Sequence, residues 1–102
     1  MRFLGVALLG VLQRQRLDKW LWHARVVRAR THAAALVEAG HVRVNGAREK
    51  SPGHPLKVDD VLTIRLDRSV RILRVTGFAE RRGNATAAKA LYDETSDVSG
   101  GS

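Results

Sequence analysis

The most informative absence in this 102-residue sequence is that of cysteine, which excludes disulfide bonds and thiolate metal sites. A reducing, cytoplasmic location fits that composition. Metal binding through other ligands is not expected either, because a metal site needs clustered ligands and the histidines are scattered along the chain. These histidines are His23, His32, His41 and His54.

Signs of catalysis are also missing. Asp59 and Asp60 are adjacent turn residues and do not form a facing pair for acid–base chemistry. No serine or threonine has an evident base partner, and no glycine-rich loop of the kind that cradles phosphates is present. We therefore predict a protein that is not an enzyme and needs no metal, nucleotide or other cofactor.

Acidic residues are few. The chain has 10 Asp and Glu against 18 Lys and Arg, a net charge of +8. Residues 14–50 hold nine of the basic residues and three acidic ones, whereas residues 51–102 hold eight and seven. This balance favours a polyanionic partner, with nucleic acid (RNA or DNA) first and an anionic membrane surface second. The alternative is a charge that only keeps the surface solvated.

Apolar runs are short. The apolar stretch of residues 3–12 has ten residues, whereas a membrane-spanning helix needs about 20. Polar residues 13–16 follow it, where a signal peptide would have a cleavage site with small residues. Residues 1–15 are therefore predicted to be an apolar extension, which either packs as an extra strap or precedes the true start of the protein.

An amphipathic helix is predicted for residues 17–28. Its apolar face follows the i, i+3, i+4, i+7 pattern through Leu17, Trp20, Leu21, Ala24 and Val27. Trp20 is predicted to lie in the core. Trp22 lies near Lys19 and His23 on the other side, where its indole either stacks on a base or packs against the C-terminal helix.

A second helix is predicted for residues 30–39, followed by Gly40, which suits the left-handed conformation at a helix end. Thr31 is predicted to cap its start. The turn before it is very short and carries Arg28 and Arg30. A helix N-terminus beside two arginines favours phosphate binding.

Period-two alternation predicts three strands after the helices, at residues 41–46, 61–66 and 70–76. Asn45-Gly46 favours a type I′ turn. Residues 47–57, which contain two prolines and a glycine, are predicted to be a loop. A small, mostly antiparallel sheet under the two helices would bury both apolar faces, so we predict an α+β fold.

The Ala-rich residues 84–95 are predicted to form a last helix, capped by Asn84 or Thr86. The Ser- and Gly-rich end is predicted to be disordered. The predicted organisation is an N-terminal extension, one domain, a helical extension and a tail, at residues 1–15, 16–80, 81–95 and 96–102.

The motif residues within 16–66 resemble the RNA-binding domain of ribosomal protein S-four, the alpha-L motif. They are RLDKWL at residues 16–21, Arg30-Thr31, Ala33, Leu36-Val37, Gly40 and Val42-x-Val44-Asn45-Gly46. Three further features are similar to the heat-shock protein fifteen family of ribosome-associated proteins: RLDKWLW at residues 16–22, Arg81-Arg82, and Ala90-Leu91-Tyr92-x-Glu94-Thr95. The resemblance implies two helices on a small antiparallel sheet, with a C-terminal helical extension.

The resemblance departs from the pattern at two positions. Ala29 stands where many members have a Ser or Thr helix cap, so Thr31 is expected to replace it. Asp59 stands where a glycine is common, and Asp tolerates the left-handed geometry required there.

The resemblance also implies a function in ribosome rescue or recycling after heat shock or other stress. The expected partners are RNA of free large ribosomal subunits and the peptidyl-tRNA that carries an unfinished chain, with no membrane involved. The motif's usual RNA contacts correspond to Arg16, Lys19, Arg30, Thr31 and Asn45, with Arg28, Arg43, Arg48 and Lys50 as looser matches. From charge and aromatic character we add Trp22, His23 and Arg25.

Two other functions stay open. One is an accessory RNA-binding module that acts with a separate RNA-modifying enzyme. The other is a basic module that docks to acidic proteins or to a membrane surface. In each case we expect a monomer.

Overall fold

The structure, a computed structural model, describes residues 14–95 of the chain. The predictions for residues 1–13 and 96–102 lie outside this part. In chain order the elements are β1 (Gln15–Arg16), α1 (Leu17–His23), α2 (Arg30–Glu38), β2 (Val42–Val44), β3 (Ala47–Arg48), β4 (Pro55–Leu56), β5 (Val61–Arg65), β6 (Val70–Val75), α3 (Ala85–Lys89) and β7 (Tyr92–Thr95).

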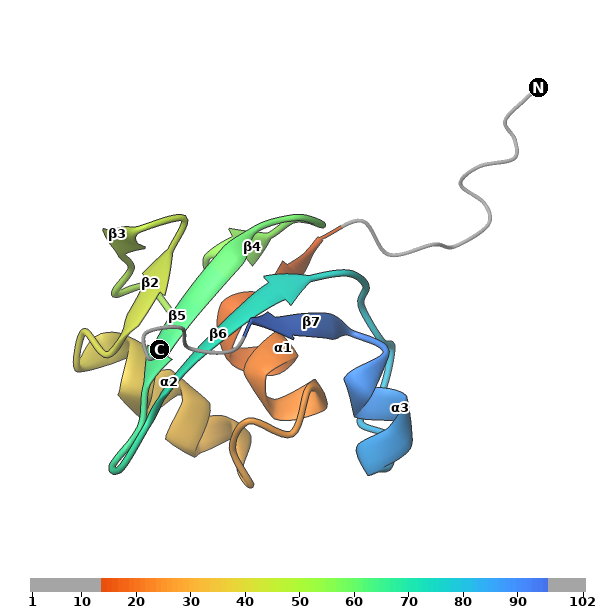
Figure 1. Ribbon diagram of the computed structural model, residues 1–102. Helices are drawn as coiled ribbons and strands as arrows, with labels where there is room; N and C mark the ends of the chain where they lie inside the picture. The colour runs from red at the N-terminus through yellow and green to blue at the C-terminus, as the bar shows by residue number, and fades with distance from the viewer. Residues whose placement is uncertain (1–13, 96–102) are drawn as a thin grey trace.

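Five of the strands form one antiparallel sheet in the order β3-β2-β5-β6-β7. Helices α1 and α2 pack on one face of this sheet (Figure 1). The side chains of β5 alternate as predicted, so that Leu62 and Ile64 are buried whereas Arg65 is exposed on the outward face. The predicted α+β fold, with two helices on an antiparallel sheet, is confirmed.

The core lies between the two helices and the sheet. Trp20 and Leu21 of α1 are fully buried, as predicted, together with Val37 of α2 and Leu73 of β6. The indole N–H of Trp20 donates to the carbonyl of Gly77 at 3.0 Å, which satisfies the polar atom of a buried ring. The first helix is thereby tied to the chain that follows β6.

Helix α1 ends at His23, so the prediction that it continues to residue 28 is wrong. Arg25 adopts the left-handed conformation, with φ of 60°. The backbone N–H groups of Arg25 and Val26 donate to the carbonyls of Trp22 and Leu21 at 3.1 and 3.0 Å, a paired helix ending that usually requires glycine. The apolar pattern continued past this point because the turn that follows is also partly buried.

Helix α2 ends as predicted, with Gly40 in the left-handed conformation (φ 85°) and its N–H donating to Val37. Its start differs from the prediction. The capping residue is Ala29, no side chain caps the helix, and Thr31 lies within the first turn with its side chain exposed. Thr31 does not replace the missing cap, because the helix begins before it, at Arg30.

The β2–β3 hairpin turns at Asn45-Gly46, where both residues have positive φ, as a type I′ turn requires. The predicted loop of residues 47–57 contains two short strands as well. One is β3, and the other is β4, which pairs with β1 outside the main sheet. Gln15 of β1 is buried, so the folded part includes a residue that the sequence placed in the N-terminal extension.

Helix α3 covers only the first part of the helix predicted for residues 84–95. Asn84 caps it as predicted and accepts from the N–H of Ala87 at 2.8 Å. From Tyr92 to Thr95 the chain forms β7, paired with β6 at the edge of the sheet. The longer helix is wrong because strand pairing overrides the local helical preference of this segment.

Candidate nucleic-acid interface

A buried carboxylate joins two of the predicted RNA-binding arginines. The side chain of Asp18, in the first turn of α1, is 5% exposed. Its two oxygens accept from Nε and Nη2 of Arg16, each at 3.0 Å, and Nε of Arg30 lies 3.7 Å from one of them. We call Arg16, Asp18 and Arg30 the Asp18 cluster. It brings together residues from the starts of both helices.

The cluster keeps Asp18 charged. Burial alone would raise the pKa of the carboxyl group. The hydrogen bonds from Arg16, the charges of Arg30 and Arg16, and the backbone N–H of Lys19 outweigh it and hold the pKa below its usual value. Because two arginines share one carboxylate, the cluster has a net positive charge.

Further predicted contacts surround this cluster. Arg28 and Thr31 are exposed beside the start of α2, and Lys19 is half-buried one residue after Asp18. Since no side chain caps α2, the backbone N–H groups of Arg30 and Thr31 are available to an anion, whereas that of His32 donates to the carbonyl of Ala29 at 3.1 Å.

The end of α1 contributes less than the sequence suggested. His23 is 1% exposed, and its Nδ1 donates to the carbonyl of Ala79 at 3.0 Å. Burial lowers the pKa of this imidazole and leaves it neutral. The prediction that His23 contacts RNA is therefore wrong: the ring is enclosed by the protein and tied to the segment before α3.

Trp22 fits neither of its two predicted roles completely. It is half-buried against the core, and the guanidinium of Arg82 lies over its ring, 5.6 Å from the centroid. Arg82 also donates to the carbonyl of Trp22 at 3.0 Å, while Nε of Arg25 donates to that of Gly83 at 2.9 Å. One side of the indole is covered by the segment before α3, rather than by α3 itself.

The hairpin residues lie elsewhere. Arg43 and Arg48 face each other across β2 and β3, and both are exposed. The amide of Asn45 donates to Asp60 at 3.0 Å and accepts from the N–H of Val61 at 2.9 Å, so this side chain serves the fold first. Lys50 is exposed near the end of α2.

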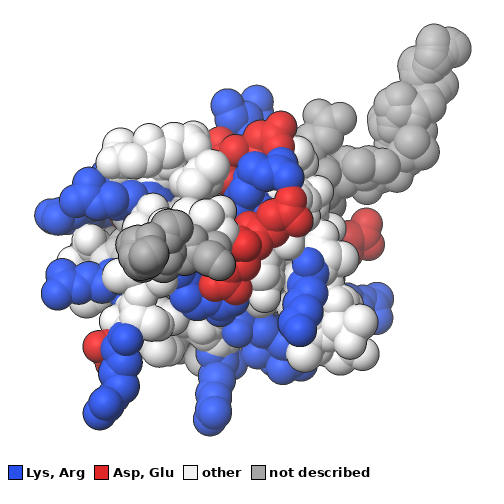
Figure 2. Space-filling view, viewed as in Figure 1, with Lys and Arg blue, Asp and Glu red and all other residues white. Residues whose placement is uncertain are grey.

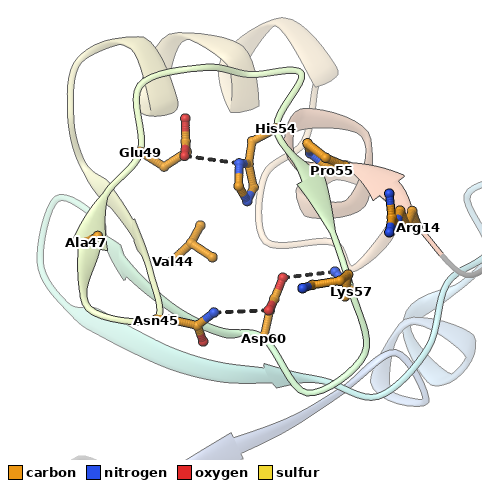
Figure 3. Close-up of a pocket in the computed structure, with 9 residues that line it drawn as sticks. All are labelled: Arg14, Val44, Asn45, Ala47, Glu49, His54, Pro55, Lys57 and Asp60. Atoms are coloured by element: carbon orange, nitrogen blue, oxygen red, sulfur yellow. Dashed lines mark hydrogen bonds and ion pairs between the residues drawn. The ribbon is translucent and has the colours of Figure 1, made fainter.

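The hairpin also borders a cavity of about 410 Å³ (Figure 3). Asp60 accepts from Asn45 and from the backbone N–H of Lys57, and Glu49 pairs with His54 at 3.1 Å. Both carboxylates in the cavity are therefore engaged with the protein, which makes it a poor candidate for acid–base chemistry.

Apart from Trp22, His23 and Arg25 at the end of α1, the predicted RNA-binding residues thus divide into two sets. One set follows the starts of α1 and α2, and the other lies on the β2–β3 hairpin. In Figure 2, Lys and Arg side chains lie at the hairpin end and along the lower edge of the visible face, whereas Asp and Glu lie in a band across its middle with Lys or Arg side chains among them. Sequence reasoning missed Arg65 and Arg82; alternation in β5 placed Arg65 on the outward face but could not give its neighbours.

Within residues 14–95, no three His, Asp or Glu side chains come together in a way that could hold a metal ion. In the same part of the chain, no helix has the length and apolar character needed to cross a bilayer.

Comparison with known proteins places this geometry in a family. Residues 15–62, which span the Asp18 cluster and the hairpin, match the S4 domain model. Heat shock protein 15 of Escherichia coli K12 is 39% identical over 82 residues, which cover 80% of this chain and 61% of that protein. The small ribosomal subunit protein uS4 of Azorhizobium caulinodans is 41% identical over 61 residues, 60% of this chain and 29% of that one.

The solved structures agree with this assignment. The trimeric structure of Vibrio cholerae heat shock protein 15 matches with a TM-score of 0.77 and 33% identity, over 82% of this chain and 84% of that one. The chain spans about three fifths of the length of the curated heat shock protein 15 relatives. With an S4 domain of alpha-L fold and this match over most of a solved relative, the chain belongs to the heat shock protein 15 family.

Proposed function

We propose that this chain is a non-catalytic RNA-binding protein that grips structured RNA through the Asp18 cluster and the start of α2. The observation that carries the proposal is the convergence of Arg16 and Arg30 on one buried carboxylate. Asp18 engages only two of the five N–H donors of Arg16, so the rest can reach a phosphate. The arginines are held in place before the RNA arrives, which reduces the entropy lost on binding.

The cluster suits the recognition of RNA shape. Its cations lie at the starts of two helices packed on a common core, which limits how far their spacing can vary. Contacts from fixed cations to phosphates position a protein on its target but do not read bases. Double-stranded RNA in particular is recognised mainly by shape and by contacts to its backbone.

Family membership supports a specific target. We propose that the RNA belongs to the large ribosomal subunit and to the peptidyl-tRNA that it retains after stalling or stress. The protein would act in the cytoplasm by binding and holding that state for rescue or recycling by other factors. The similarity to ribosomal uS4 proteins supports a ribosomal RNA target in general terms.

The first test removes one cation. Arg30→Ala should weaken RNA binding and flatten its salt dependence, since each lost phosphate contact lowers the log–log slope by about 0.9 for duplex DNA, with a comparable effect for RNA. Arg68→Ala removes an exposed arginine from the turn between β5 and β6 and is the matched control. Equal slopes for wild type and Arg30→Ala would exclude this residue from the interface.

The second test concerns the target. Extracts from heat-stressed or translation-arrested cells should show the protein in the free large-subunit fraction of a gradient, released by high salt and enriched where peptidyl-tRNA is retained. Sedimentation with small subunits, or with a separate RNA-modifying enzyme and no ribosomal particle, would contradict the rescue function. The salt titration of wild type and Arg30→Ala would then still test whether the protein binds RNA.

A further inference from the structure

The outward face of the sheet holds a small basic cavity on the side opposite α1 and α2. Its volume is about 190 Å³, and we call it the arginine pocket. The polar side chains that line it are His41, Arg43, Arg48, Thr63 and Arg65.

Strand register explains why these side chains meet. Arg43 is the partner of Arg48 across β2 and β3, and of Thr63 across β2 and β5. Directly opposed residues of antiparallel strands project to the same face. Arg65 lies two residues after Thr63, hence on that face too, and its backbone N–H donates to the carbonyl of His41 at 2.8 Å. Three arginine side chains thus line one hollow, and Nη1 of Arg43 also donates to the carbonyl of Gly46 at 3.2 Å.

The charge of the pocket is not balanced by the protein. Among residues 14–95, no carboxylate lies within ion-pair distance of Arg43, Arg48 or Arg65. Like charges that face each other directly across strands are destabilising. The side chain of Arg48 passes over Gly40, where a Cβ atom would stand 3.2 Å from its Cδ, so the glycine leaves room for this arginine beside the pocket. This geometry concentrates positive charge where a solvated surface would disperse it.

We propose that the arginine pocket binds a phosphate group of the RNA backbone, at a site separate from the Asp18 cluster. Guanidinium groups match phosphate oxygens with paired hydrogen bonds, and the hydroxyl of Thr63 adds a donor. The inference rests on the proposed RNA binding and deepens it. Because the two sites lie on opposite sides of the sheet, the RNA contacts the protein on two faces and passes around the β2–β3 hairpin.

The test uses Arg65, the member of the pocket that the S4 motif does not supply. In salt titrations with structured RNA, Arg65→Ala should lower the slope by about 0.9 and the affinity several-fold. Arg68→Ala, three residues further along the chain, should change neither. Arg65→Lys should restore the slope but only part of the affinity, because lysine keeps the charge without the paired geometry. Far-ultraviolet circular dichroism of each variant verifies that it is folded.

A second measurement separates the possible sources of phosphate. Orthophosphate should raise the melting temperature of wild type more than that of Arg65→Ala at equal ionic strength. The difference between the two proteins is the readout, because phosphate is excluded from protein surfaces and stabilises most folded proteins without binding to them. A response to orthophosphate with unchanged RNA slopes would overturn the proposal and indicate a site for free phosphate. Equal slopes for Arg65→Ala and Arg68→Ala with no orthophosphate difference would also overturn it. If Arg30→Ala is the only variant that lowers the salt slope, the proposed RNA binding stands and only the arginine pocket is excluded from the interface.

Discussion

The two halves of the sheet treat arginine differently. In the half formed by β6 and β7, Nε and Nη2 of Arg71 donate to the two oxygens of Glu94 at 2.9 and 2.8 Å. Arg71 opposes buried Ile64 and Glu94 opposes buried Leu73, so this pair lies on the helix side of the sheet. Arg74 lies on the outward face, between Asp59 and Asp93. Each arginine of this half is balanced by carboxylates of the protein, and we call it the paired half.

The half formed by β2, β3 and β5 contains the arginine pocket, and within residues 14–95 its arginines have no carboxylate partner. Exposure alone therefore does not identify an arginine that binds RNA. Arg71 ties the edge strand to the sheet and keeps the pKa of Glu94 below its usual value, chiefly through its hydrogen bonds. An arginine with no carboxylate partner keeps its full charge for an external phosphate, whereas Arg16 must use the N–H donors that Asp18 leaves free.

The largest expected effect tests whether the paired half depends on its ion pairs or on the core beneath them. Leu73 of β6 is fully buried under this half. Leu73→Ala should lower the free energy of unfolding by about 2–5 kcal/mol in urea denaturation, because it leaves a cavity in the core. The orthophosphate response of the arginine pocket should persist. If Leu73→Ala lowers the free energy of unfolding by less than the loss of an exposed ion pair does, the ion pairs and not the core stabilise this half.

Asp18 offers a third way to balance arginine, with a buried acid. Asp18→Asn should lower the free energy of unfolding by roughly 1.5–3 kcal/mol, since it removes charged hydrogen bonds to Arg16. The folded pKa of Asp18 lies below its ordinary value of 3.8. The contribution is therefore complete above pH 3.8 and lost as the pH falls through the folded pKa. Denaturation curves of the two proteins should converge on acidification; a constant difference would contradict this account.

The paired half itself should respond weakly. Glu94→Gln removes one exposed partner and should cost about 0.2–1 kcal/mol, less at high salt. Its RNA salt slope should equal that of wild type, in contrast to Arg65→Ala. If Glu94→Gln instead tightens RNA binding, the released Arg71 has become a phosphate contact. Its ion pair with Glu94 is then what normally prevents this half from binding RNA.

The smallest effect is spectroscopic. Burial lowers the pKa of His23 below its ordinary value of 6.5, so its NMR signals should titrate at lower pH than those of an exposed imidazole. Because the unfolded chain binds this proton more readily, stability should fall as the pH drops from 6.5 to the folded pKa. Addition of orthophosphate should move the signals of His41, at the pocket, and leave those of His23 unchanged. The reverse pattern would place the anion near α1.

Much of this arrangement followed from local patterns. Alternation in residues 61–66 predicted both the strand and its buried side, and Gly40 marked the end of α2. The end of α1 could not be predicted, because arginine rarely adopts the left-handed conformation of Arg25. The edge strand β7 was missed because its pairing with β6 depends on residues far away in the sequence.

The candidate site shows the same limit. Composition and motif indicated arginines around both helices and the hairpin. They could not show that Asp18 bonds to Arg16 and approaches Arg30, because that contact depends on how the two helices pack. Nor could they separate buried His23 from exposed His41, since neither histidine has a polar residue directly beside it in the sequence. Register across β2 and β5 was needed to bring Arg65 to Arg43.

The tie between α1 and the segment before α3 has a consequence for the synthesis of this protein. Gln15 and His23 both donate to the carbonyl of Ala79, and Trp20 donates to that of Gly77, across 56 to 64 positions of sequence. In a growing chain α1 is translated long before Gly77 and Ala79, so Gln15, Trp20 and His23 must wait for these hydrogen-bond partners. Long-range contacts of this kind delay folding and expose apolar surface on the way. Helix α1 is therefore translated early but secured late, and a chain arrested before residue 77 would lack the carbonyls that hold it.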